Sequence, residues 1–193
     1  RGWRGICVDP NPEVSGMFKL ARPKDVFVNV GVGGVLGGRS TPSGTSGPQH
    51  DIPAESFAVQ AGRRNDVMSY FMFDEGATNT FSEDRAEENQ KAGRKLIGTK
   101  KVKILSLKKI LDKYLEKGKK IDLLSVDVEG MDLEVLKSND WKKYRPKVII
   151  CEDLEFDLGK FGGRKNGEVV GYLGELEYKL MAVTPYSLIF KEK

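Results

Sequence analysis

The sequence predicts an α/β fold with a mostly parallel sheet that ends in an antiparallel hairpin. Residues 5–30 alternate between strand-like and helix-like patterns, residues 121–151 repeat that alternation, and residues 178–190 hold two strand-like runs at hairpin distance. A strand, a helix and a second strand in succession are typical of a parallel sheet. Two runs joined by a short turn are instead expected to pair in antiparallel orientation.

The N-terminal part is predicted to contain a strand at residues 5–8, a helix within residues 13–21 and a strand at residues 25–30. The first strand ends at Asp9, because the Pro-Asn-Pro sequence that follows removes backbone donors and favours a turn. Residues 31–48 are mostly Gly, Ser, Thr and Pro, and this composition buries too little apolar surface to order itself. We therefore expect a flexible insertion at about residues 35–66.

The middle of the chain resumes regular structure at residues 67–73 and is expected to be helical at residues 82–95, where Ser82 begins an incomplete capping box. The best-defined helix covers residues 107–115. Leucine, isoleucine and tyrosine recur there at three- and four-residue spacing, after Ser106 as an N-cap candidate.

The C-terminal part is predicted to hold apolar strands at residues 121–126 and 147–151, with a short helix at residues 131–137 between them. A further helix then presents Val169, Leu173 and Leu176 on one face. The predicted hairpin follows at residues 178–183 and 186–190, interrupted by a Thr-Pro pair. Both apolar strands end in acidic residues.

Length and composition limit the class of protein. A chain of 193 residues with 39% apolar and 31% charged residues suits a single ordered domain. Its longest apolar runs are a few residues, far short of the roughly 20 that span a bilayer, and no secretion signal is visible. We therefore expect a cytoplasmic protein, in which Cys7 and Cys151 are reduced core residues.

The main functional signal is a set of polar side chains where predicted strands end: Asp9, Asn29, Asp127, Glu129 and Glu152. Ligands of open α/β sheets bind beyond the carboxyl ends of the strands. An acid such as Asp9 can accept hydrogen bonds from a nucleotide ribose, although it could equally cap the turn that follows. Asp127 and Glu129, in extended geometry, would point to the same side toward one ligand or metal. Their alternative role is to cap the helix that starts near Met131.

Other motifs are weaker. Glycines at positions 31, 33 and 37 resemble a phosphate-binding loop, but no helix follows them, so this reading is disfavoured. His50 is the only histidine, so a catalytic triad or a multi-histidine metal site has little material. Residues 94–120 contain eleven Lys or Arg, which could contact nucleic acid. We expect them to form the solvent face of a helix instead, because aromatic residues are not interleaved with them.

Four segments, taken in order, resemble the FkbM family of S-adenosylmethionine-dependent methyltransferases. They are Gly-Trp-Arg-Gly-Ile-Cys-Val-Asp-Pro-Asn-Pro-Glu at residues 2–13, Thr-Asn-Thr-Phe-Ser at 78–82, Ile-Asp-Leu-Leu-Ser-Val-Asp-Val-Glu-Gly-Met-Asp-Leu-Glu-Val-Leu at 121–136, and Arg-Pro-Lys-Val-Ile-Ile-Cys-Glu at 145–152. The resemblance covers most of residues 1–34 and 67–191. Its most specific part is Asp-Val-Glu-Gly followed by Leu-Glu-Val-Leu.

This resemblance implies a Rossmann-like class I methyltransferase fold and methyl transfer to a hydroxyl of a sugar, polysaccharide or secondary metabolite. Asp9 and Asn11 would then bind the ribose of S-adenosylmethionine, and Asn29 would lie near the adenine. Asp127 and Glu129 would face the methyl donor and acceptor as catalytic residues. Asn79, Thr80 and Glu152 would line the acceptor side.

Two departures from the family pattern are expected. Family members carry a first strand and a Gly-rich loop ahead of the Gly-Trp-Arg-Gly segment, and this chain starts after them. We therefore expect an N-terminally incomplete member whose sheet lacks its central strand. The insertion at residues 35–66 is the second departure.

The expected chemistry is an in-line displacement in which the protein aligns donor and acceptor. A carboxylate, Asp127 first and Glu129 second, would take or orient the hydroxyl proton, aided if burial raises its pKa or if a divalent metal is present. The alternative is a non-catalytic member that keeps the fold and binds a carbohydrate or a protein partner. Nucleic acid is the less favoured partner, and the sequence leaves the oligomeric state open.

Overall fold

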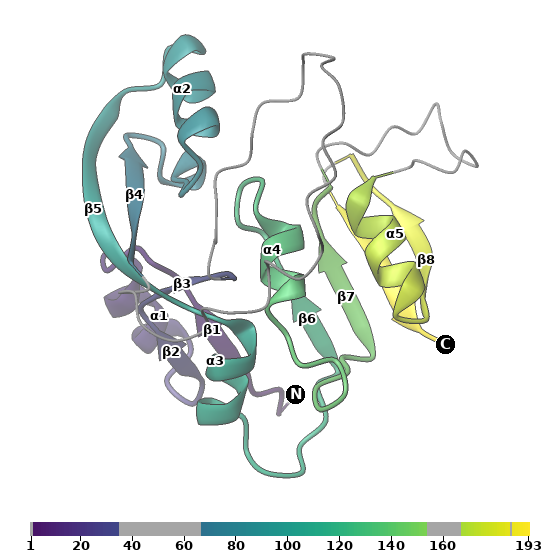
Figure 1. Ribbon diagram of the computed structural model, residues 1–193. Coiled ribbons are helices and arrows are strands. Elements are labelled where there is room, and N and C mark those ends of the chain that lie inside the picture. The colour runs from purple at the N-terminus through teal and green to yellow at the C-terminus, as the bar shows by residue number, and fades with distance from the viewer. Residues whose placement is uncertain (1, 35–66, 154–166, 186) are drawn as a thin grey trace, which may run out of the picture.

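The computed structural model describes residues 2–34, 67–153, 167–185 and 187–193 (Figure 1). The strands are β1 (Ile6–Val8), β2 (Val26–Val28), β3 (Gly31–Val32), β4 (Val67–Phe73), β5 (Leu96–Leu105), β6 (Leu123–Ser125), β7 (Val148–Cys151), β8 (Tyr178–Val183) and β9 (Leu188–Glu192). The helices are α1 (Val14–Ala21), α2 (Glu83–Lys91), α3 (Leu107–Tyr114), α4 (Asp132–Lys137) and α5 (Glu168–Glu175), with a short 3₁₀ turn η2 (Gly76–Thr78). The predicted insertion at residues 35–66 lies outside the described residues.

The described strands form three sheets rather than one. Their orders are β1-β2, β3-β5-β4 and β6-β7-β9-β8. The α/β class is confirmed, but the expectation of a mostly parallel sheet is wrong for this part of the chain. Parallel pairs join β1 to β2, β3 to β5 and β6 to β7, and antiparallel pairs join β4 to β5, β7 to β9 and β8 to β9.

Much of the difference comes from β5, which the sequence analysis missed. Lys100 and Lys101 are both exposed, so the alternation of apolar and polar residues that signals a strand is interrupted there. The strand forms because it pairs along the length of β4, from Val67 opposite Lys103 to Phe73 opposite Leu96. This antiparallel pair carries α2 beside it (Figure 1).

The helix starts follow from their caps. The hydroxyl of Ser106 accepts a hydrogen bond from the backbone N–H of Lys109 at 3.2 Å, as predicted for α3. Lys108, Lys109 and Lys113 lie on the exposed face of this helix, also as predicted. Ser82 caps α2 in the same way, accepting from the N–H of Arg85 at 3.2 Å, although its capping box is incomplete.

The main core lies around the four-stranded sheet. Its most buried members include Leu136 of α4, Ile149 of β7, Leu173 of α5 and Phe190 of β9, none more than 1% exposed. The C-terminal hairpin is confirmed, with β9 lying between β7 and β8. Both cysteines are free thiols, as expected, but only Cys151 is a core residue, because Cys7 is half-buried.

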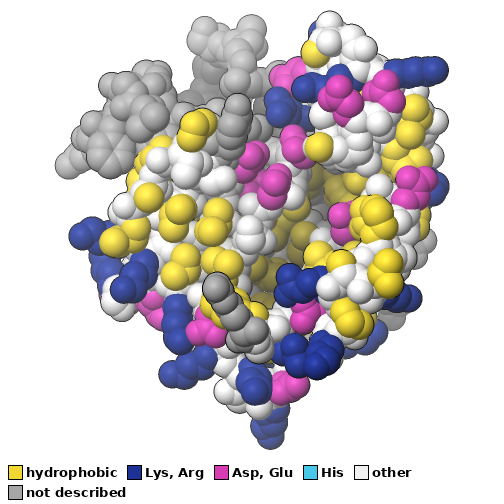
Figure 2. Space-filling model, turned by 180° about the vertical axis from the view of Figure 1, so that it is seen from behind, with side chains coloured by type: hydrophobic (Ala, Val, Ile, Leu, Met, Phe, Trp, Pro, Cys, Tyr) yellow, Lys and Arg dark blue, Asp and Glu magenta, His cyan; other side chains and the backbone are white. Residues whose placement is uncertain are grey.

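The parallel pair β1-β2 and the parallel pair β6-β7 belong to separate sheets. Among the described residues, β1 pairs only with β2, and β6 pairs only with β7. Figure 2 shows the molecule from behind, hollowed between its two halves, with apolar side chains on the floor of the hollow and acidic side chains at one end of it. No helix in the described ranges is both long enough and apolar enough to span a membrane.

Candidate functional site

The predicted cofactor residues lie together where β1 and β2 end. One carboxylate oxygen of Asp9 accepts a hydrogen bond from the backbone N–H of Asn11 at 2.7 Å. The side-chain amide of Asn29 donates to the backbone carbonyl of Asp9 at 2.8 Å. Asn11 in turn accepts from the N–H of Glu13 at 3.0 Å, just before α1. The turn-capping role considered for Asp9 is therefore present, and the same bonds fix the three side chains relative to one another.

Asp127, Glu129 and Glu152 form a second group, where β6 and β7 end. Glu129 does not continue the strand, because its φ is +52° and that of Gly130 is +93°. The expectation that Asp127 and Glu129 share one side of an extended strand is therefore wrong. The turn still keeps these carboxylates close enough to Glu152 for their charges to raise its pKa.

The helix-capping alternative for Asp127 and Glu129 is not what the structure shows. The N-cap of α4 is Met131, which makes no side-chain cap hydrogen bond, and the acidic residues in the first turn are Asp132 and Glu134. The sequence analysis overlooked Asp132, which is only 4% exposed. The pattern offered one signal, since Asp132 stands at the start of an apolar helix face where a buried acid needs a specific partner.

Thr80 belongs to this second group, whereas Asn79 serves β4. Thr80 is 1% exposed, and its hydroxyl donates to the backbone carbonyl of Glu129 at 3.4 Å. The side-chain oxygen of Asn79 accepts from the N–H of Phe73 at 2.7 Å, at the end of β4. Only Thr80 of the two thus contacts the β6 turn directly in the described structure.

Arg85 lies beside this second group, and no sequence pattern pointed to it. Its guanidinium lies 3.7 Å from the carboxylate of Glu129 and 2.8 Å from that of Glu88. Its Nε is buried and has no hydrogen-bond partner among the described residues. The Ser82 cap sets where α2 begins and so where Arg85 projects. One cation therefore faces a group of carboxylates.

Burial and mutual repulsion perturb these carboxyl groups. Desolvation, followed by the charges of Asp127, Asp132 and Glu129, raises the pKa of Glu152 to about 7. Desolvation also raises the pKa of Asp132 to about 6, against the lowering effect of two backbone N–H groups. The pKa of Glu129 is raised as well, by burial first and then by Asp127, while Arg85 opposes the shift. Clustered shifts of this kind are typical of functional sites.

These shifts predict that stability depends on pH. A carboxyl group whose pKa rises on folding binds more protons in the folded state between its two pKa values, so the free energy of unfolding falls as pH rises through that window. For Glu152 the window runs from about pH 4.5 to about pH 7. After discounting for solvent screening, we expect a loss of about 1 to 2 kcal/mol between pH 5 and pH 8.

Urea denaturation of the wild type and of Glu152→Gln at several pH values measures this effect. The Gln variant should lose the slope above about pH 6, whereas Asp132, with its pKa raised to about 6, should still produce a slope below that pH. Asp122→Asn is the control, because Asp122 is exposed and pairs with Lys147 at 2.6 Å just before β6 begins. An identical slope in all three proteins would show that Glu152 is not perturbed.

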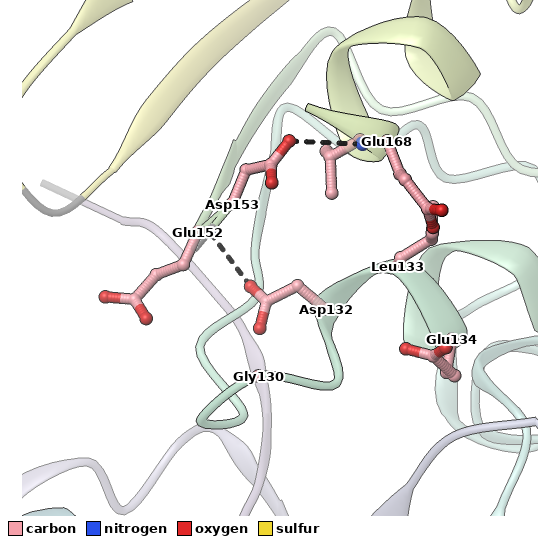
Figure 3. Close-up of a pocket in the computed structure, with 8 residues that line it drawn as sticks. Gly130, Asp132, Leu133, Glu134, Glu152, Asp153 and Glu168 are labelled. Carbon is pink, nitrogen blue, oxygen red and sulfur yellow. Dashed lines mark hydrogen bonds between the residues drawn. The ribbon is translucent and has the colours of Figure 1, made fainter. Parts of the chain in front are cut away.

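A pocket of about 290 Å³ lies beyond the end of β7, beside the starts of α4 and α5 (Figure 3). The close-up shows Asp153 directed to the first turn of α5 and Asp132 directed to the backbone of Glu152. Five of its lining residues are acidic: Asp132, Glu134, Glu152, Asp153 and Glu168. Carboxylates accept hydrogen bonds from hydroxyl groups, so this lining suits a neutral polyhydroxylated molecule or a cationic one.

The phosphate-loop reading is not supported in the described residues. Gly31 lies in β3 opposite Ile104. A Cβ on Gly31 would lie 2.3 Å from the side chain of Ile104 and 2.7 Å from that of Phe81, so this glycine permits close packing between β3 and its neighbours. Gly37 and His50 lie outside the described residues. No group of three or more His, Cys, Asp or Glu within the described ranges is arranged to hold a metal ion.

The positive φ of Glu129 predicts a conflict between stability and function. A non-glycine residue in the left-handed region costs about 1 kcal/mol or more, so Glu129→Gly should raise the free energy of unfolding by about 1 kcal/mol. Glu177, with φ +65°, provides a matched control, because it is exposed and lies between α5 and β8. Both glycine variants should gain stability in urea denaturation. Only Glu129→Gly should weaken the binding of S-adenosylmethionine, the cofactor that the family resemblance implies. Equal affinities of both variants for this cofactor would place Glu129 outside the site.

The fold is that of an α/β protein in which acidic side chains gather at the ends of the parallel strands β6 and β7. Residues 1–180 match the family model of the methyltransferase FkbM domain. The protein therefore belongs to the FkbM methyltransferase family, which confirms the resemblance seen in the sequence. No curated protein and no solved structure matches the chain.

Proposed function

We propose that this protein is an S-adenosylmethionine-dependent O-methyltransferase that acts on a hydroxyl of a sugar, polysaccharide or other secondary metabolite. The observation that carries the proposal is the gathering of Asp127, Glu129 and Glu152 where β6 and β7 end, with the pKa of Glu152 raised to about 7. A general base whose pKa lies near the working pH is the most effective one. Family membership supplies the reaction class.

The side chains that follow β1 and β2 fit the ribose of the proposed cofactor. The carboxylate of Asp9, held by the backbone N–H of Asn11, matches the two hydroxyls of a ribose, and Asn29 holds the backbone carbonyl of the same residue. Asp9 and Asn11 would hold that ribose, and Asn29 would lie near the adenine. The acidic group at β6 and β7 is favourable for a positively charged sulfonium. When bound, S-adenosylmethionine supplies an activated methyl group, so the side chains are needed mainly for alignment and proton removal.

Within this proposal, Glu152 accepts the proton of the acceptor hydroxyl as it attacks. The pKa shift favours Glu152 over Asp127 and Glu129, the residues first considered for the base. Asp127 and Glu129 then face the donor and the acceptor and orient them. Thr80 holds the backbone of Glu129, and the acidic pocket beside Glu152 receives the acceptor. Asn79 is not among the residues that line this pocket, so its proposed contact with the acceptor would be made from the end of β4.

Calorimetric titration with S-adenosylmethionine and S-adenosylhomocysteine tests the proposal. The wild type should bind both, and Asp9→Asn should bind each about 10- to 150-fold more weakly, because one charge-assisted hydrogen bond contributes about 1.5 to 3 kcal/mol. The exposed Asp122→Asn variant should bind like the wild type. Both ligands should retain their order of affinity in all three proteins.

A different outcome would favour a different function. If the wild type shows no heat of binding with either ligand at millimolar concentration, the cofactor assignment is wrong. The remaining candidate is then a non-catalytic family member that binds a carbohydrate or a protein partner. The observation in its favour is that β1 and β6, the strands nearest the two halves of the site, do not pair with each other among the described residues.

A further inference from the structure

Asp132 connects the two strand ends that carry the candidate carboxylates. It is the first residue of α4 and is 4% exposed. Its Oδ1 accepts a hydrogen bond from the backbone N–H of Glu152 at 2.9 Å, and its Oδ2 accepts one from the N–H of Val128 at 3.3 Å. One carboxylate therefore joins a backbone group beyond β6 to one beyond β7.

These two bonds replace strand pairing at the point where it stops. The last paired residues of β6 and β7 are Ser125 and Ile150, and the N–H of Val126 then bonds to the carbonyl of Ile150 at 2.8 Å. Beyond that bond the two strands separate. Val128 lies between Asp127 and Glu129, so the carboxylate of Asp132 holds the backbone from which all three site carboxylates project.

The bonding pattern distinguishes this role from ordinary helix capping. A capping carboxylate accepts from N–H groups in the first turn of its own helix, whereas both donors to Asp132 lie outside α4. Both partners are N–H donors, and an ionised carboxylate is an acceptor only, so it satisfies both at once. An asparagine at this position would set its NH₂ group against one of the two donors.

We propose that Asp132 is a positioning residue that fixes the ends of β6 and β7, and with them Asp127, Glu129 and Glu152, for methyl transfer. The effect of Asp132 on methyl transfer rests on the proposed function, whereas its two hydrogen bonds to the strand ends do not. The charged and titratable groups around Asp132 are Asp127 and Glu129 after β6, Cys151, Glu152 and Asp153 at the end of β7, Glu134 of α4 and Glu168 of α5.

The ionised form of Asp132 is the one that holds both strand ends. Burial raises its pKa to about 6, and the two backbone N–H groups oppose that rise. At pH 7 most molecules therefore carry the bridging carboxylate. Protonation converts one oxygen into a donor, which removes its ability to accept from the N–H beside it. Both amides should sense this change together.

Amide NMR of the full chain over pH 4.5 to 8 tests the bridge directly. In the wild type, the N–H signals of Val128 and Glu152 should shift with a common midpoint near pH 6. In Asp132→Asn the component with a midpoint near pH 6 should be lost from both amides, which leaves at residue 152 the titration of its own carboxyl group. The midpoint of the Glu152 carboxylate, followed by its ¹³C signal, should move to lower pH because a neighbouring charge is gone. Asp122→Asn should change none of the three readings.

The outcomes separate this inference from the proposed function. Wild-type amides that share no midpoint near pH 6 would overturn it, and that reading does not require a folded Asp132→Asn protein. An unchanged Glu152 midpoint in a folded Asp132→Asn would overturn it as well. If the amides titrate together while calorimetry detects no S-adenosylhomocysteine binding, the bridge stands and the methyltransferase assignment fails.

Discussion

Glu152→Gln is expected to lower the rate of methyl transfer by about 10²- to 10⁴-fold, the usual contribution of a positioned general base. Glutamine has nearly the same shape as glutamate but cannot accept the hydroxyl proton. The backbone N–H of residue 152 should still bond to Asp132, since that bond does not use the side chain. The defect should therefore appear in turnover, with little change in cofactor affinity.

The pH profile gives this prediction its second readout. With the pKa of Glu152 raised to about 7, the wild-type rate should increase as pH rises through about 7 and then level off, because only the ionised form accepts a proton. The Gln variant should lose this limb. Bound sulfonium is positively charged, so the midpoint should lie somewhat lower when S-adenosylmethionine is saturating.

The assay measures release of S-adenosylhomocysteine with a panel of neutral methyl glycosides as acceptors. Asp122→Asn is the control and should match the wild type. A Glu152→Gln protein with wild-type turnover would remove Glu152 from the role of base. Asp127→Asn would then be the next variant to test, because Asp127 is the other carboxylate considered for proton removal.

Sequence periodicity predicted the elements whose side chains pack on one side. The spacing of Leu107, Ile110 and Leu111 after Ser106 fixed α3, and all three side chains are buried as expected. The same reasoning failed for β5, because this central strand of the three-stranded sheet has consecutive exposed lysines where alternation would require an apolar residue. Its existence depends on pairing with β4, which no local pattern reveals.

The residues of the candidate site also fall into those that the sequence indicated and those that it did not. The grouping of Asp127, Glu129 and Glu152 could be predicted, because acids that directly follow neighbouring parallel strands gather at the carboxyl ends of those strands. Their roles stay predictions, as does the role of Asp9, which follows the separate β1-β2 pair. Arg85 and Asp132 could not be assigned roles from the sequence. Arg85 reaches Glu129 from a helix 44 positions away in the chain. The role of Asp132 depends on a left-handed turn at Glu129 that brings the N–H of Val128 back toward α4.

The largest expected loss of stability follows from Phe190→Ala, at about 3 to 5 kcal/mol. Phe190 is 1% exposed and lies in β9, opposite Ile149 of β7 and Leu180 of β8. Removing its ring leaves a cavity in the core beside the four-stranded sheet, where paired strands and packed helices can close in only partly. Because β7 carries Glu152, the loss should also loosen the site.

Urea denaturation followed by circular dichroism measures this effect, with Met181→Ala as the matched control. Met181 lies on the neighbouring strand β8 and is 54% exposed, so its truncation should cost less than about 1 kcal/mol. If Phe190→Ala does not fold, Phe190→Leu keeps most of the apolar volume and should lose about 1 to 1.5 kcal/mol. Equal stabilities for the Phe190 and Met181 variants would mean that the four-stranded sheet is not the main source of stability, and that β7 is held in place by other contacts.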